Sequence, residues 1–207
     1  MTLSKEQIAG LNNAFNEAAL IGAEFNASTQ RLGLTLGVVS VNPDGTVPSD
    51  RRVAVHLSPV GRLWASLRNS RWDDDTAEPI PFTSDQLLEI VQSFQAQSIY
   101  GWEFFDCDES TMARWKSRLS LNFENGTDGL KHTLDLFQDG GNRILDLRIW
   151  FDEIAFFTPE HQPISIGNFN AAGKRAWDAI MIAQDKDVQN AFCIYPGALS
   201  HSDKGKE

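Results

Sequence analysis

The sequence predicts an α+β protein in which helices pack on a mostly antiparallel sheet. Two observations lead to this fold class. Several strand-like runs follow one another between a few helical segments, whereas a doubly wound parallel sheet would alternate strands with helices. The order of helix, strands and helix also occurs twice along the 207 residues. This repetition suggests two similar helix–strands–helix halves.

The first half, approximately residues 1–98, is predicted to begin with a helix over residues 4–19. Ser4 and Gln7 form a capping-box pattern, and apolar residues then recur at helical spacing. Alternating apolar residues predict four strands, over residues 21–25, 31–41, 52–57 and 62–67. Pro59 is expected to break the chain between the last two, at an edge or a bend.

A polar loop at residues 69–81 and a second helix at residues 83–96 complete the first half. Thr83 and Gln86 repeat the capping-box pattern at the start of that helix. The short aromatic segment 99–106, IYGWEFFD, is then predicted to be a strand at the junction of the halves.

The second half, approximately residues 107–185, is predicted to repeat the order of the first. It comprises a short helix that begins at Asp108 or Ser110, strands at residues 119–123, 130–137 and 143–157, and a last helix over residues 170–184. The sequence Asp139-Gly140-Gly141-Asn142 predicts a hairpin turn between the last two strands. The polar residues 200–207 are expected to form a disordered tail after a single domain of residues 1–199.

A constant offset also relates residues of the two halves. Phe25, Thr29, Leu32, Thr35 and Leu36 line up with Phe123, Thr127, Leu130, Thr133 and Leu134. These identities alone are weak, because a chain of this length produces such matches by chance, and the shared order of elements carries more weight. The alternative is that α+β proteins reuse similar patterns. We therefore favour an internal duplication within one domain.

Composition limits the classes of function. The formal net charge of −10 argues against sequence-independent binding to nucleic acid or to an anionic membrane, which requires clustered Lys and Arg. Two cysteines without paired spacing, Cys107 and Cys193, predict a reducing cytoplasm. The first residues, MTLSKEQIAG, lack the basic start and apolar core of a signal peptide.

The closely spaced carboxylates Glu103, Asp106, Asp108 and Glu109 form the most suggestive polar cluster. Such a cluster can bind a divalent cation or support acid–base chemistry. The spacing does not match an EF-hand, and Asp108 is equally suited to cap the predicted helix that follows. We favour the capping role.

No motif assigns a catalytic residue, a metal ligand or a cofactor. The four histidines are scattered without zinc-site spacing, and there is no GxSxG, P-loop or GxGxxG pattern. Acidic neighbours are expected to raise the pKa of the Cys107 thiol, which disfavours a reactive nucleophile. Asp152-Glu153, which interrupts an apolar run, is expected to form an exposed bend.

Most tryptophans, including Trp64, Trp102 and Trp150, have apolar neighbours that predict the core. Trp72 precedes three aspartates in a loop and is expected to be exposed. The candidate binding surface combines this loop with the aromatic junction segment, and its residues are Trp72, Asp73, Asp74, Asp75, Tyr100, Trp102 and Glu103.

These features favour a non-enzymatic acidic protein that binds a basic protein partner, in the manner of inhibitor or immunity proteins. One alternative is a small-molecule-binding module with an aromatic pocket between the halves. The other is a metal-dependent hydrolase that uses Glu103, Asp106 and Asp108.

Overall fold

In the computed structural model, residues 2–74, 76–108, 115–126 and 130–183 are described. They form an α+β fold in which three α-helices and a short 3-10 turn accompany a seven-stranded antiparallel sheet. The helices are α1 (Lys5–Phe15), α2 (Leu87–Gln92) and α4 (Ile166–Ala183), and the 3-10 turn η1 (Ser84–Gln86) leads into α2. No described helix is long and apolar enough to cross a membrane.

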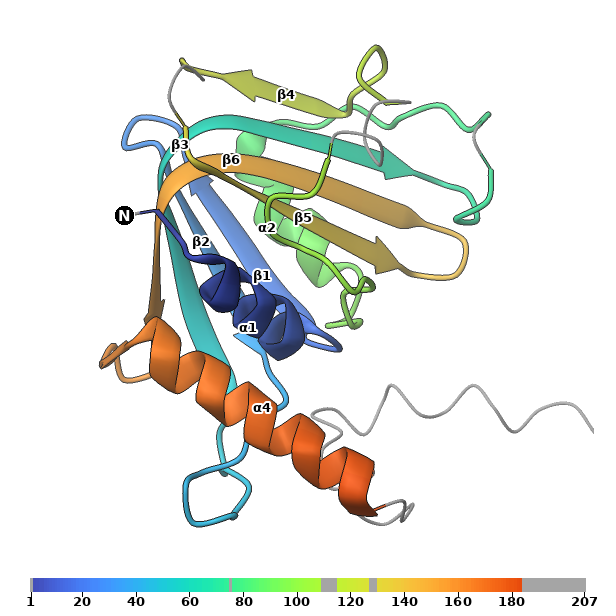
Figure 1. The fold of residues 1–207 in the computed structure, drawn as a ribbon. Helices are drawn as coiled ribbons and strands as arrows, with labels where there is room; N and C mark the ends of the chain where they lie inside the picture. The colour runs from blue at the N-terminus through green and yellow to red at the C-terminus, as the bar shows by residue number, and fades with distance from the viewer. Residues whose placement is uncertain (1, 75, 109–114, 127–129, 184–207) are drawn as a thin grey trace, which may run out of the picture.

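The strands form the order β1-β2-β3-β6-β5, with β4 and β7 added to the long central strands. Their bounds are β1 (Ala19–Asn26), β2 (Arg31–Gly37), β3 (Arg52–Arg68), β4 (Leu121–Glu124), β5 (His132–Asp139), β6 (Ile144–Phe157) and β7 (Pro163–Ile164). β3 and β6 pair along almost their whole length (Figure 1). The first part of β3 also pairs with β2, and its last part pairs with β4.

The predicted break at Pro59 is a local irregularity inside one continuous strand. β3 runs through Pro59 from Arg52 to Arg68, and the pairing with β6 shifts register between Val60 and Arg62. Gly61 lies at this bulge, where an added Cβ would be 2.1 Å from the Gly126 carbonyl oxygen. Pro59 thus lies just before a bulge, in a stretch of β3 that pairs with neither β2 nor β4, and proline in a sheet is typical of such places.

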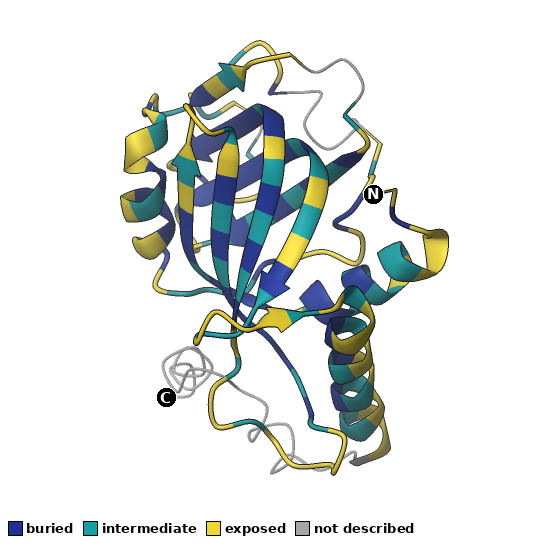
Figure 2. Ribbon diagram, turned by 90° about the vertical axis from the view of Figure 1, so that its left-hand side faces the viewer, coloured by how far each residue is buried: buried dark blue, intermediate teal, exposed yellow. Residues whose placement is uncertain are grey.

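The core lies on one face of the sheet and follows the strand period of two. Along β3 and β6 the buried side chains that contribute to it are Val53, Val55, Leu57, Val60, Leu63, Ala65, Leu67, Leu145, Leu147, Ile149, Phe151 and Phe156. Figure 2 shows the resulting alternation of burial along the strands. Phe15 of α1 contacts Phe105 and Phe169, whose ring centroids are 5.0 and 5.9 Å away. These aromatic contacts join α1, α4 and the junction segment to one core.

Helix α1 begins where the sequence predicts. The Ser4 Oγ accepts a hydrogen bond from the Gln7 amide, and the Gln7 side chain accepts one from the Ser4 amide. Both donors would otherwise lack a helical partner, so the box fixes the start of the helix.

Several other predicted boundaries differ from the structure. α2 ends at Gln92 instead of residue 96, and α4 begins at Ile166 instead of residue 170. β6 continues through Asp152 and Glu153, so the predicted exposed bend at these residues is wrong. The short helix near Asp108 or Ser110 and the tail 200–207 lie mainly or wholly outside the described residues.

The junction segment 99–106 is not the regular strand that the sequence predicts. It joins the edge of β5 through two isolated bridges, Ile99 with Gln138 and Phe105 with Leu134. At its start, the Ile99 amide donates to the Ala18 carbonyl, and Ser98 bridges to Ala19 of β1. The two ends of the strand order therefore approach each other at this corner, which curves the sheet around the core.

Candidate functional site

The junction segment is fixed on both sides of a short projecting tip. On one side, the Tyr100 amide donates to the Phe137 carbonyl of β5 over 2.9 Å. On the other, the Asn12 side-chain oxygen of α1 accepts hydrogen bonds from the Phe104 and Phe105 amides, at 2.9 and 3.1 Å. Residues 101–103 lie between these anchors, and we call them the strap tip.

The strap tip presents Trp102 to solvent. Trp102 is 85% exposed, although its apolar neighbours predict a core position, so that prediction is wrong. Gly101 precedes it with φ of +152°, a backbone conformation that favours glycine. Phe104 and Phe105, which follow, are buried in the core. The backbone is thus fixed on both sides, at Tyr100 and at the buried Phe104. The side chains of Trp102 and Glu103, which lie between these points, are exposed to solvent.

The aromatic residues of the candidate surface are exposed. In the described part of the chain, the exposed large aromatic side chains are Trp72, Tyr100 and Trp102. Glu103 is exposed beside Trp102, and Asp73 beside Trp72. Both groups thus combine aromatic and acidic side chains, as the sequence predicts.

The Trp72 loop and the strap tip are separate groups of residues. Asp73 forms an ion pair with Arg71 at 3.7 Å, and Asp74 accepts hydrogen bonds from the amide and hydroxyl of Thr76. These hydrogen bonds, that from the hydroxyl first, lower the pKa of Asp74. Among the described residues, no hydrogen bond, ion pair or ring contact joins this loop to the strap tip. Asp75 lies outside the described residues.

The carboxylates that suggest a metal site have other partners or lie apart. Asp106 accepts a hydrogen bond from the Thr133 amide at 2.8 Å and contacts Nδ1 of His132 at 2.8 Å. Nε2 of His132 in turn accepts a hydrogen bond from the Leu3 amide at 3.0 Å. Within the described residues, no three His, Cys, Asp or Glu side chains gather as metal ligands. The hydrolase alternative therefore gains no support from this cluster.

The second face of β3, β6 and β5 carries a buried polar layer that sequence reasoning missed. Arg148 pairs with Asp135 at 3.0 Å, and Arg68 pairs with Asp146. The Trp115 ring covers Arg68, with 3.5 Å between the guanidinium carbon and the ring centroid. Asp146, Arg148 and Trp150 recur at intervals of two in the run 143–157, so the alternation of β6 contained this signal.

Arg148 also fastens the end of the junction segment to the sheet. Its terminal nitrogens donate to the Cys107 and Asp108 carbonyls at 2.7 and 2.8 Å. Burial raises the pKa of Asp135 to about 7, against the opposing effect of Arg148. Burial, with the Asp135 charge next, also raises the pKa of Cys107 to about 11, which agrees with the predicted unreactive thiol.

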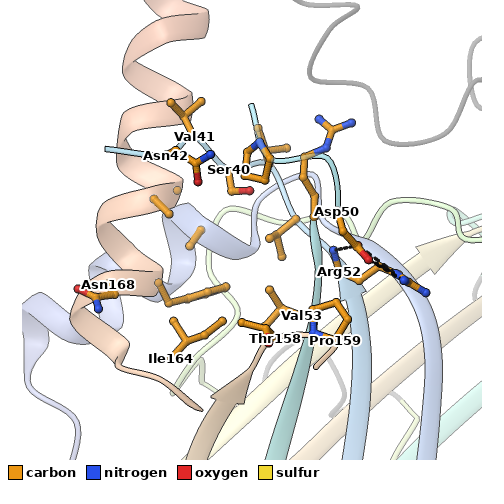
Figure 3. Close-up of a pocket in the computed structure, with 18 of the residues that line it drawn as sticks. Ser40, Val41, Asn42, Asp50, Arg52, Val53, Thr158, Pro159, Ile164 and Asn168 are labelled. Carbon is orange, nitrogen blue, oxygen red and sulfur yellow. Dashed lines mark hydrogen bonds and ion pairs between the residues drawn. The ribbon is translucent and has the colours of Figure 1, made fainter. Parts of the chain in front are cut away.

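A cavity of about 390 Å³ lies between α4 and the chain between β2 and β3 (Figure 3). Residues of both predicted halves line it, from Ala14 to Val53 and from Thr158 to Arg175. Its walls are mainly aliphatic, whereas the sequence-based alternative expected aromatic ones. Phe169 is the single aromatic residue among the described lining residues.

No protein-family model, curated protein or solved structure matches this chain.

Proposed function

We propose that this protein is a non-enzymatic binding protein that captures a basic protein partner through the strap tip and the Trp72 loop. The observation that carries this proposal is Trp102, which is 85% exposed on a backbone held from both sides. Tryptophan on a fixed backbone is typical of the anchors that dominate protein interfaces, because little conformational freedom is lost when it is buried.

Charge supports a basic partner. Glu103 lies beside Trp102, Asp73 and Asp74 follow Trp72, and the chain has a formal net charge of −10. Such a surface attracts a cationic partner and speeds its association, and added salt weakens the attraction. An inhibitor- or immunity-like role in the cytoplasm fits this chemistry, and the two cysteines of the sequence fit a reducing compartment.

Affinity capture from a lysate of cells that carry the gene tests this proposal. The wild-type chain, Trp102→Ala and a control, Met181→Ala, would be compared at low and high salt. Met181 is 74% exposed and lies near the end of α4, outside both proposed binding groups. We expect one partner with wild type and control, released by high salt and lost with Trp102→Ala. Equal capture by all three chains would contradict the proposal.

We also propose that the domain arose by internal duplication. In support, the first half contributes the antiparallel pair β2 and β3, the second half contributes the antiparallel pair β5 and β6, and β3 and β6 pair centrally. β1 lies outside β2 as the junction segment lies outside β5. The proposal rests on this topology more than on the residue matches.

A further inference from the structure

The cavity beside α4 is a second candidate site, independent of the strap tip. Its volume of about 390 Å³ lies in the range typical of pockets for small organic molecules. Small residues line it where the helices α1 and α4 meet. A Cβ added at Gly173 would be 2.7 Å from the Ala14 Cβ, and Ala172 presents only a methyl group.

The interior of this cavity suits an aliphatic group. Its apolar lining residues include Val38, Val39, Val41, Val53, Ile164 and Phe169. Figure 3 shows Val53, Ile164 and Pro159 on one side of the space and Val41 on another. Transfer of an alkyl group from water to such walls is favourable, by roughly 0.8 kcal/mol per buried methylene group.

The charged residues that line the cavity favour an anion, although the whole chain is acidic. Among the described lining residues are three arginines, Arg51, Arg52 and Arg175, and two acids, Asp50 and Glu160. Asp50 is already paired with Arg52, with 2.6 Å between Oδ2 and Nη2. Arginines therefore outnumber acids among the described residues around the apolar space.

Arg175 is the residue best placed to hold a carboxylate. Its Nε donates to the Val41 carbonyl over 2.9 Å, which fixes the guanidinium beside the cavity. Its two terminal nitrogens have no hydrogen-bond or ion-pair partner in the part of the chain that the structure describes. A guanidinium held in this way offers a forked pair of donors that matches a carboxylate.

We infer that this cavity binds a small amphipathic anion, with an aliphatic body between α4 and the β2–β3 connection and one carboxylate on Arg175. A neutral analogue would keep the apolar contacts and lose the ion pair. A cationic analogue would meet the arginines, even though the net charge of −10 attracts cations to the protein in general.

Calorimetric titration of the full chain with octanoate, octan-1-ol and octylamine tests this inference. We expect one octanoate per chain, and affinity for octylamine lower by about tenfold or more, since an ionic hydrogen-bonded contact is replaced by like-charge repulsion. Octanoate that binds no better than octylamine, or does not bind at all, would overturn the inference.

Two variants and a control locate the site. Ala172→Phe fills the cavity and is expected to abolish octanoate binding. Arg175→Gln is expected to lower the affinity for octanoate by about tenfold and to leave the affinity for octan-1-ol unchanged. Arg71→Gln, in the exposed loop after β3, is the matched control and is expected to bind as wild type. An octanoate affinity that is unchanged in Arg175→Gln would overturn the contact assigned to Arg175. These titrations do not test the capture of a protein partner through Trp102, so the two proposals can fail separately.

Discussion

Individual buried polar residues fasten the segments that flank the proposed binding surface. His132, only 4% exposed, lies between the Leu3 amide and the Asp106 carboxylate. Nε2 accepts from the amide, so Nδ1 carries the proton and donates to Asp106. This side chain therefore connects the N-terminal segment, β5 and the end of the junction segment.

We predict that His132→Phe loosens the N-terminal segment. The ring keeps its volume, but the Leu3 amide loses its acceptor and Asp106 loses a donor. The free energy of unfolding should fall by about 1–3 kcal/mol, and the Leu3 amide should exchange hydrogen faster. Denaturant unfolding and hydrogen exchange measure both effects, with the exposed neighbour Lys131→Gln as control. Unchanged exchange at Leu3 would refute the contact.

Asp135 makes stability depend on pH in a defined direction. Its pKa is raised from 3.8 to about 7, mainly by burial, so the folded state binds the proton more tightly than the unfolded chain. The stability that protonated Asp135 contributes is fully present below about pH 3.8 and is lost as the pH rises through about 7.

The variant Asp135→Asn should remove this pH dependence. We predict that wild type loses stability relative to Asp135→Asn between pH 4 and pH 7, in urea unfolding at several pH values. Groups other than Asp135 titrate in both chains, so their contribution cancels in the difference in unfolding free energy between wild type and variant. A stability difference that stays constant, or changes in favour of wild type as the pH rises, would contradict the raised pKa.

Among the elements, α1 and α4 depend on close backbone approach. Gly173 of α4 faces Ala14 of α1, whereas Gly167, one and a half turns earlier, has no atom closer than 4.0 Å to an added Cβ. Two neighbouring hydrogen bonds join the same helices, from Asn170 to the Gln7 carbonyl and from the Trp177 indole to the Asn13 carbonyl. Close packing of Gly173 against Ala14 and these hydrogen bonds therefore both stabilise the helix pair.

The two glycines predict opposite effects of the same substitution. Gly173→Ala should destabilise the protein by about 1–3 kcal/mol, because the new methyl group overlaps Ala14. Gly167→Ala should stabilise it by about 0.5–1 kcal/mol, because alanine is the better helix former and meets open space. Thermal or denaturant unfolding of the two variants decides this, and equal effects would show that α1 and α4 do not pack as described.

The sequence predicted those elements whose cause is local. Capping boxes at Ser4 and Thr83 and the glycine turn after Asp139 lie where expected. Elements that depend on contacts with residues far along the chain differ from their predictions. Amides of the junction segment donate hydrogen bonds to the Asn12 side chain and to β5. The segment therefore does not form a regular ladder of strand hydrogen bonds. Pro59 lies inside β3, just before a bulge and between the stretches that pair with β2 and with β4.

Within the molecule as a whole, the two proposed sites lie on different elements. The junction segment closes one corner and carries Trp102, while α4 and the β2–β3 connection enclose the cavity. The exposure of Trp72 and Asp73 could be predicted from their place in a polar loop. That of Trp102 could not, because it depends on the anchors at Tyr100 and Phe104. The cavity and the buried pairs of Arg148 and Arg68 could not, because they depend on contacts between residues far apart in sequence.

Site-specific photo-crosslinking in cells tests the central claim most directly. A photoreactive amino acid would replace Trp102 in one chain and Glu24, exposed on β1, in a control chain. If the strap tip binds a partner, position 102 will yield one discrete crosslinked protein with basic character, and position 24 will not. Crosslinks of equal yield at both positions, or none at position 102, would contradict a binding surface at the strap tip.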